Sequence, residues 1–423
     1  MALLSRFGLR ADTAGGAAGR DRTIIYVTAF LRAAGTGTTG VLMGVYLAKL
    51  GFSTSIIGLI IAAGLAGGAF EVLPATFAAD RVGRRLFLTA LAVLGAIGGL
   101  AVASSSHAVI IAIAAFAGML NGMGKDRGAA LVIEQAILPS TTSDQNRTQA
   151  FAFYNVLQAA GAALGALLAA SPPVLVRLGM PDLAAARIVM AGYGVLMLVT
   201  AMLYPMLSGA VETRTASIGF GHVSRDTRRV MVKLSGLFVI DSIGGGFLSQ
   251  ALIAYFVALR FGAGVGTIGL LFFAAHLANG ASQFGAAFLA RRIGLVNTMV
   301  FTHIPGSLLL IGFAFAPNFP IAAILFLIRE GLIQMDVPTR QSYVMAIVQP
   351  EERTFAAGVT GLVRLGGWAI APGIAGLAMQ SVSLASPLII GSFLKVGYDL
   401  LLYRAFREIR PPEETAVAQA HRQ

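Results

Sequence analysis

Ionisable residues stand inside segments of the chain that are otherwise apolar. A charge at the centre of a bilayer costs about 2.5–3.5 kcal/mol on insertion scales, so each must pair with another group or line water. Such residues commonly carry protons or bind polar solutes in membrane proteins. The candidate solute and proton pathway consists of Arg32, Glu71, Asp126, Arg127, Asp241, Arg329 and Arg364.

The carboxylates of this set are candidate proton carriers. Asp126 stands between Lys125 and Arg127, and a carboxylate in such a setting can exchange a proton as its surroundings change. Glu71 is an isolated acid in an apolar run; a hydrogen bond to a neighbouring helix is the alternative role for it. Glu134 lies eight residues after Asp126, so the two share one helical face, and we expect Glu134 to belong to a gate.

Other polar residues in the apolar segments favour structural roles. Arg329 and Glu330 are adjacent and face different directions, so a mutual ion pair is not expected to satisfy both. His276 and His303 are too scattered for a metal site, and each is expected to be a hydrogen-bonded core residue. Packing is also the commoner role of the remaining candidates for solute binding, Tyr154, Asn155, Tyr343 and Trp368.

Several reaction types are excluded by missing residues. The chain has no Cys, which excludes disulfides, thiolate metal sites and cysteine nucleophiles. No hydrolase triad is visible, and no Gly-Lys-Ser/Thr loop that would cradle a nucleotide phosphate. The sequence therefore predicts no enzyme activity, no cofactor and no metal, and an ion gradient is the expected energy source.

The composition determines the elements that must hold these residues. Of 423 residues, 57% are hydrophobic and only 12% are charged, and the mean hydropathy is +0.79. A soluble protein carries about 25% charged residues, so lipid must surround most of this chain. Twelve apolar segments are predicted, at about 23–48, 56–78, 86–103, 108–134, 148–171, 184–207, 229–258, 267–289, 295–316, 320–347, 353–380 and 384–406.

The distribution of Lys and Arg predicts the orientation. With the N-terminus in the cytoplasm, the loops on that side receive 21 Lys and Arg, Arg340 among them, and the other side receives four. Cytoplasmic loops collect positive charge, so both termini are expected in the cytoplasm. The net charge of +12 then reflects topology and not a nucleic-acid partner. The first residues lack the apolar core of a cleaved signal peptide.

The two halves of the chain repeat one another. The run Tyr46-Leu-Ala-Lys-Leu-Gly-Phe, then Ile57-Gly-Leu, is echoed by Tyr255-Phe-Val-Ala-Leu-Arg-Phe, then Ile268-Gly-Leu, at offsets of 209 and 211 residues. Two parallel six-helix bundles are therefore predicted in an all-α membrane protein. The predicted parts are a tail at 1–21, a half at 22–207, a linker at 208–228, a half at 229–406 and a tail at 407–423.

The repeat also pairs polar positions. Asp241 stands 209 residues after Arg32, so the two opposite charges are expected at equivalent depths, both facing a central cavity; local pairing between helices is the alternative. Arg364 aligns with Gln158 at an offset of 206 residues, which marks a polar position in both halves.

One loop carries a family resemblance. Ala78-Ala-Asp-Arg-Val-Gly-Arg-Arg85 resembles the signature loop of the major facilitator superfamily, roughly G-x-x-x-D-R-x-G-R-R, with Thr76 in place of the first Gly. Together with the repeat, the resemblance covers residues from about 22 to 406. It implies the twelve-helix fold and a cytoplasmic charge network that locks one transport state. The gating residues it implies are Asp80, Arg81, Gly83, Arg84 and Arg85.

The direction of transport rests on weaker motifs. The run from Gly366 to Gly376 is similar to the antiporter motif of the family, but it lies in the eleventh segment and not the fifth. The run from Gly118 to Gly124 is similar to part of the drug-exporter pattern and lacks its Arg. Other stretches look like a group of poorly characterised bacterial facilitators.

We therefore expect a proton-coupled secondary transporter of a small organic solute. It is expected to work as a monomer in the lipid bilayer of a bacterial inner membrane, exporting its solute by antiport. One alternative is a proton-coupled importer of an anion held by Arg32, Arg127, Arg329 or Arg364. Another is a non-transporting receptor on the same fold.

Overall fold

The structure, a computed structural model, describes residues 16–126, 128–142, 147–212, 224–336, 339–340, 343 and 353–407. Each of the twelve predicted apolar segments contains helix, and no strand occurs among the described residues. Eight helical stretches in the described part of the chain are long and apolar enough to cross a membrane. The all-α membrane fold is confirmed.

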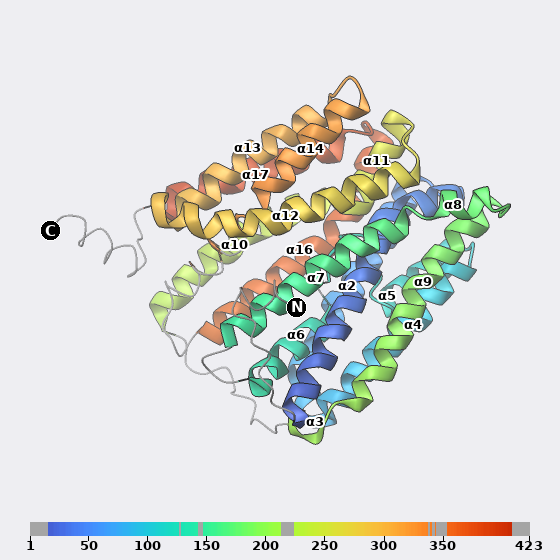
Figure 1. Ribbon diagram of the computed structural model, residues 1–423. Helices are drawn as coiled ribbons and strands as arrows, with labels where there is room; N and C mark the ends of the chain where they lie inside the picture. Colours follow the sequence, from blue (N-terminus) through green and yellow to red (C-terminus); the bar gives the residue numbers. More distant parts are fainter. Residues whose placement is uncertain are drawn as a thin grey trace, which may run out of the picture.

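The first half of the chain forms one bundle (Figure 1). Its helix α2 packs against α7 and α9, α4 packs against α9, and α3 packs against α5 and α6. The helices of this half are α2 (Ala17–Lys49), α3 (Thr54–Val82), α4 (Arg84–Ser104), α5 (Ala108–Ala117), α6 (Ala129–Ile137), η1 (Leu138–Thr141), α7 (Arg147–Ala169), α8 (Pro172–Arg177), α9 (Asp182–Leu203), η3 (Tyr204–Met206) and η4 (Gly209–Val211).

The second half forms the other bundle (Figure 1). Here α10 packs against α16 and α17, and α13 packs against α14 and α17. The helices of this half are α10 (Arg225–Phe247), α11 (Gln250–Phe261), α12 (Val265–Ile293), α13 (Leu295–Ala314), α14 (Phe319–Ile333), α16 (Arg353–Ser381) and α17 (Ser386–Phe406).

Three of the predicted segments are not continuous helices. The fourth is interrupted between α5 and α6, where Met119 and Gly124 have positive φ of 52° and 68°. The seventh is interrupted at residues 248–249, and the tenth has a turn at 334–335. Non-helical backbone is tolerated at membrane depth where protein or a cavity surrounds it, and four glycines between 118 and 128 weaken the helix there.

The backbone repeats between the halves. Gly51 and Gly262, which are 211 residues apart, both have positive φ (84° and 63°). Gly83 and Gly294, again 211 residues apart, have φ of 107° and 88° and each joins two helices directly. Glycine adopts these angles without the steric cost that a side chain adds. The repeat seen in the sequence is therefore also a repeat in turn geometry.

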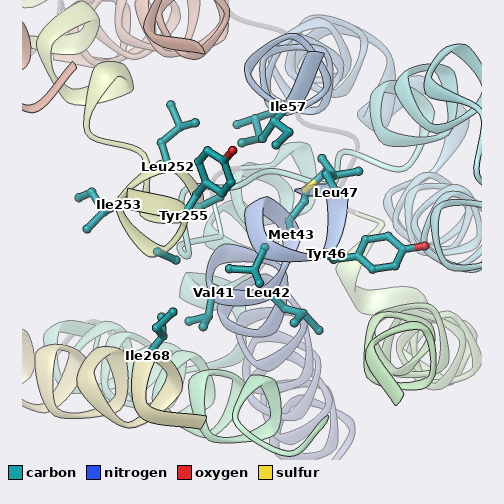
Figure 2. Packing of buried hydrophobic residues seen from close by; sticks show 14 of the residues in the cluster. Val41, Leu42, Met43, Tyr46, Leu47, Ile57, Leu252, Ile253, Tyr255 and Ile268 are labelled. Atoms are coloured by element: carbon teal, nitrogen blue, oxygen red, sulfur yellow. The ribbon is translucent and has the colours of Figure 1, made fainter. Parts of the chain in front are cut away.

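The halves meet closely at one end, which we call the closed end, where the loop between α2 and α3 lies. Gly58 of α3 lies against Pro372 and Gly376 of α16, and the backbone N–H of Ala251 donates to Gly122 O across 2.8 Å. Apolar side chains from both halves share one cluster here, and Figure 2 shows Tyr255 of α11 among residues of α2 and α3.

The bundles separate away from the closed end. The buried apolar side chains there form two further clusters, one built from the first half and one from the second, with Leu365 of α16 packed against the first. In Figure 1 the start of α10 and the end of α3 point to different sides of the molecule. The buried apolar cluster that both halves share is thus at the closed end.

Candidate functional site

A polar cavity lies mainly within the second half. Its volume is about 850 Å³, its open mouth included. Helices α10 to α14, α16 and α17 line it, and Met123 and Lys125 from the interrupted fourth segment reach it from the first half. Five cationic side chains and three carboxylates line the cavity: Lys125, Arg329, Arg340, Arg364, Lys395, Asp241, Glu330 and Asp336.

Asp241 of α10 is the most heavily contacted carboxylate of this cavity. Lys395 Nζ of α17 donates to Asp241 Oδ1 across 2.8 Å, and Arg364 Nη1 of α16 lies 3.4 Å from Oδ2. Arg340 Nη1 is 3.8 Å from Oδ2 and also pairs with Asp336. The Asp241 side chain is buried. Cations from three elements thus converge on one carboxylate.

Trp368 holds Arg364 beside this carboxylate. The Arg364 guanidinium carbon lies 4.8 Å from the centre of the Trp368 ring and 5.7 Å from that of Phe238. A cation over an aromatic face is stabilised by the ring quadrupole. Gly245 makes room for the indole, because a Cβ there would come within 3.0 Å of Trp368 Nε1. The arrangement presents a guanidinium and an aromatic face together to the cavity.

Several polar atoms around the cavity have no hydrogen-bond partner among the described residues. They are Gln250 Nε2, His276 Nε2, Asn279 Oδ1, Arg329 Nε, Asp336 Oδ1 and Arg364 Nη1. Buried polar atoms are bonded in the large majority of cases, so a group of exceptions around one cavity indicates a site for a polar solute. The expectation that His276 is a satisfied core residue is wrong, because it faces this cavity.

Arg329 and Glu330 contact each other, contrary to the sequence expectation. Arg329 Nη1 pairs with Glu330 Oε1, and Asn279 Nδ2 donates to Glu330 Oε2 across 2.9 Å. Long side chains on adjacent residues can curl towards one another, so that their charged ends meet. The Glu330 carboxylate is therefore held on the side of the cavity formed by α12 and α14.

A second charge cluster lies inside the first half. Arg32 of α2 binds Glu134 of α6 in bidentate fashion, with Nη1–Oε1 of 2.5 Å and Nη2–Oε2 of 2.8 Å, and its Nε donates to Asp126 Oδ2 across 2.9 Å. Tyr154 and Tyr204 donate their hydroxyls to Glu134 across 2.8 and 2.9 Å. The side chains of Arg32 and Glu134 are buried, so this cluster ties α2, α6, α7 and η3 together.

The two charges at equivalent repeat positions therefore have different surroundings. Arg32 and Asp126 line a smaller pocket that is formed by the first half and by Leu365 of α16, whereas Asp241 lines the large cavity of the second half. The expectation that both face one central cavity is wrong. Arg32 is fully occupied by two carboxylates, which is the alternative of local pairing.

The remaining predicted site residues lie elsewhere. Glu71 lines neither of the two pockets, and its buried Oε2 has no hydrogen-bond partner in the described part of the chain. Arg127 lies outside the described residues, as do the side chains of Asp80 and Arg81. Of the predicted pathway residues, the cavity brings together Asp241, Arg329 and Arg364.

The signature loop binds the start of the chain segment that links the halves. The Glu212 carboxylate accepts from the backbone N–H of Arg84 across 2.7 Å and from that of Arg85 across 3.2 Å, at the N-terminus of α4. Arg85 Nη2 donates to Pro205 O across 2.6 Å. A carboxylate at a helix N-terminus binds free N–H groups and faces the positive end of the helix dipole. Sequence reasoning missed Glu212, which no motif marks.

Removal of this carboxylate has a measurable expected cost. We expect Glu212→Ala to lower the free energy of unfolding by about 0.5–2 kcal/mol, the range for loss of an N-terminal helix cap. Thermal unfolding in detergent measures it, and Glu212→Gln, which keeps one acceptor oxygen, should lose less. Equal stability of Glu212→Ala and the wild type would contradict this role.

Other cavity residues were missed or misplaced by the sequence. Arg340 was assigned to a cytoplasmic loop, and the structure corrects this, because its side chain is buried beside Asp241 and Asp336. Lys395 was not a candidate, although a lysine in the last apolar segment is a detectable signal. His303 Nδ1 lies 3.0 Å from Oδ1 of Asp399, which is in the last apolar segment together with Lys395. The two residues are 96 positions apart in the chain, so no local pattern indicates the pair.

The chain is similar in sequence to known membrane proteins. A sequence model of the Major Facilitator Superfamily matches residues 25–239 and 234–422 of the chain. The protein described as "Uncharacterized membrane protein YJR124C" of Saccharomyces cerevisiae is 25% identical over an alignment of 419 residues. The match covers 91% of this chain and 94% of that protein.

Solved transporter structures share the fold. The nucleoside transporter NupG superposes with a TM-score of 0.70 at 14% identity, over 92% of this chain and 98% of that one. The xylose transporter XylE from E. coli, in an inward open conformation, superposes with a TM-score of 0.69 at 14% identity, over 90% and 96%. At such identities the likeness extends to the fold and not to the solute.

Proposed function

The chain belongs to the Major Facilitator Superfamily, and from this premise we propose that it is a proton-coupled secondary transporter of a small organic solute. The observation that carries the proposal is the cavity of the second half. It combines polar atoms that have no hydrogen-bond partner among the described residues, which suit a solute, with a buried carboxylate, Asp241, as the proposed proton carrier. Solute and proton would therefore meet at one place.

Transport would proceed by rocking of the two halves around this cavity. Contacts between the halves at the closed end support one end state, in which the cavity is sealed from that side. The excess of Lys and Arg in the predicted cytoplasmic loops supports a closed end outside the cell and both termini in the cytoplasm. We propose that the protein acts as a monomer in a plasma membrane and consists of the predicted tails, halves and linker. The loop from Asp80 to Arg85 and the Glu134 carboxylate would stabilise one transport state.

The direction of coupling is proposed from the contacts of Asp241. The antiporter-like run in α16 supports export, but its glycines also have a packing role: Gly367 lies against Ser242, and Gly376 against Gly58. An anion that takes over the cations around Asp241 leaves that carboxylate free to accept a proton. Solute and proton then travel together, so we favour co-transport of an anion, and antiport export is the second candidate.

Flux across a proteoliposome membrane tests this function. We expect members of a broad panel of organic solutes to move protons when added to liposomes that contain the protein, and an imposed pH gradient to drive solute accumulation. Alkalinisation of the medium on the side of solute addition indicates co-transport, and acidification indicates antiport. A protein that binds solutes but moves none would be a non-transporting receptor on the same fold.

Alternating access can be tested at the closed end. Ser55 N–H donates to Gln380 Oε1 across 3.3 Å, joining the two halves. Because the chain has no Cys, the double variant Ser55→Cys/Gln380→Cys can be crosslinked without background. We expect crosslinking to stop solute flux and reductant to restore it, since the closed end can then no longer open.

A matched control lies at the same end of the first half. Arg187 Nη2 donates to Ser106 Oγ across 2.6 Å, within one bundle. Crosslinking of Ser106→Cys/Arg187→Cys should leave flux unchanged. Unchanged flux in the crosslinked Ser55/Gln380 pair would contradict rocking of the halves.

A further inference from the structure

The cavity contains a carboxylate that is enclosed by positive charge. Asp241 of α10 faces Arg364 from α16, Lys395 from α17 and Arg340 from the end of the tenth segment. The other titratable groups beside it are Asp336, which pairs with Arg340, the Tyr398 hydroxyl on α17, and the hydrogen-bonded pair of His303 on α13 and Asp399 on α17.

We propose that Arg340, Arg364 and Lys395 form an anion site, in which the Asp241 carboxylate occupies the place that the carboxylate or other acidic group of an organic solute takes during transport. The inference rests on the proposed transport function and names its substrate class, an organic anion. It also assigns Asp241 as an internal competitor of that anion.

The charge of the cavity favours an anion over a neutral or cationic solute. Five cations and three carboxylates line the cavity, so its lining carries a net positive charge. Arg364 Nη1, which lies 3.4 Å from Asp241 Oδ2, and Arg329 Nε have no hydrogen-bond partner among the described residues. A guanidinium is suited to bidentate recognition of carboxylate and phosphate groups.

The same place offers an apolar surface for the body of the solute. The Trp368 ring stacks beside Arg364, and Phe272 and Phe326 also line the cavity. Aromatic faces next to a guanidinium suit an organic anion with a planar or apolar part. An inorganic anion would use the cations alone.

Competition between the two anions explains coupling. When the solute binds Lys395 and Arg364, the Asp241 carboxylate loses its charged partners in a buried site, where an unpaired charge is costly. A proton from the solution then takes the place of those cations on Asp241. Binding of anion and proton is therefore mutually favourable, and the linkage is reciprocal.

The single tryptophan of the chain makes this site observable. Trp368 is the one Trp in the sequence and lies against Arg364, so its fluorescence in the full-length protein reports on this cavity alone. The probes are iodide as an anionic quencher, caesium as a cationic one and acrylamide as a neutral one. We expect iodide, scaled to acrylamide, to quench more strongly than caesium.

Three variants separate the anion site from simple exposure of the indole. Lys395→Gln is expected to lower the acrylamide-scaled iodide quenching by about threefold to fivefold. Asp241→Asn should raise it. Arg260→Gln, which removes an exposed cation at the closed end of the same half, should change nothing. Size-exclusion profiles establish that each variant is folded.

Organic probes test the solute class directly. Benzoate and succinate should protect Trp368 from iodide, and their amides benzamide and succinamide should not. Equal protection by the amides, or iodide quenching that is unchanged in both Lys395→Gln and Asp241→Asn, would overturn the anion site. The flux assay tests the transport function separately. If the protein shows this fluorescence behaviour but transports no solute, the anion site is supported and the transport function is contradicted.

Discussion

Replacement of Asp241 by Asn is expected to abolish solute accumulation driven by a pH gradient, while the protein remains folded. The Asn side chain keeps the shape of Asp and cannot exchange a proton. It also leaves Lys395 and Arg364 without their carboxylate partner, so an anion should bind at any pH. Exchange of solute down its own gradient can therefore persist, but without proton movement.

Proteoliposomes with and without a pH gradient measure this effect. Asp182→Asn is the control, because Asp182 forms an exposed pair with Lys49 at the closed end and its side chain is 62% exposed. Glu71→Gln tests the other candidate proton carrier. Wild-type pH dependence in Asp241→Asn, with loss of coupling in Glu71→Gln, would move the proton site from α10 to α3.

Replacement of Arg32 by Met is expected to cause the largest loss of stability. The change leaves the buried carboxylates of Glu134 and Asp126 without their cation, and removal of one partner from a buried ion pair costs about 3–5 kcal/mol. The hydroxyls of Tyr154 and Tyr204 still bond Glu134, but neutral donors cannot balance two charges.

Thermal unfolding in detergent, or urea titration where it is reversible, measures this loss. Lys49→Met is the matched control, since it removes a cation from a solvent-exposed pair with Asp182, and such pairs contribute less than about 1 kcal/mol. Arg32→Lys keeps the charge without the bidentate geometry and should fall between the two. Arg32→Met as stable as Lys49→Met would show that the cluster does not hold the first half together.

Much of the architecture was predictable from the sequence because lipid imposes simple rules. Apolar runs of about 20 residues become helices, since every backbone group in a bilayer must bond internally. The equivalent turns at Gly83 and Gly294 were readable as a repeat at an offset of 211 residues. The rarity of charge in these runs also pointed to Asp241 and Arg364, which line the cavity.

The partners of the charges were not predictable in the same way. Arg32 and Asp241 stand at equivalent repeat positions, yet the first is held by Glu134 and Asp126, and the second by cations from α16 and α17. Lys395 is 154 residues from Asp241 in the chain, and no local spacing rule connects residues that far apart.

The sequence by itself determined that the chain spans a membrane as two repeated helical bundles, because composition and period act along each segment separately. The tertiary structure alone decided which charges share a cavity. Non-helical breaks redirect the fourth and seventh segments, and the packing of α10, α16 and α17 brings one carboxylate among three cations. Such encounters depend on long-range packing, and in a medium of low dielectric they decide what each charge can do.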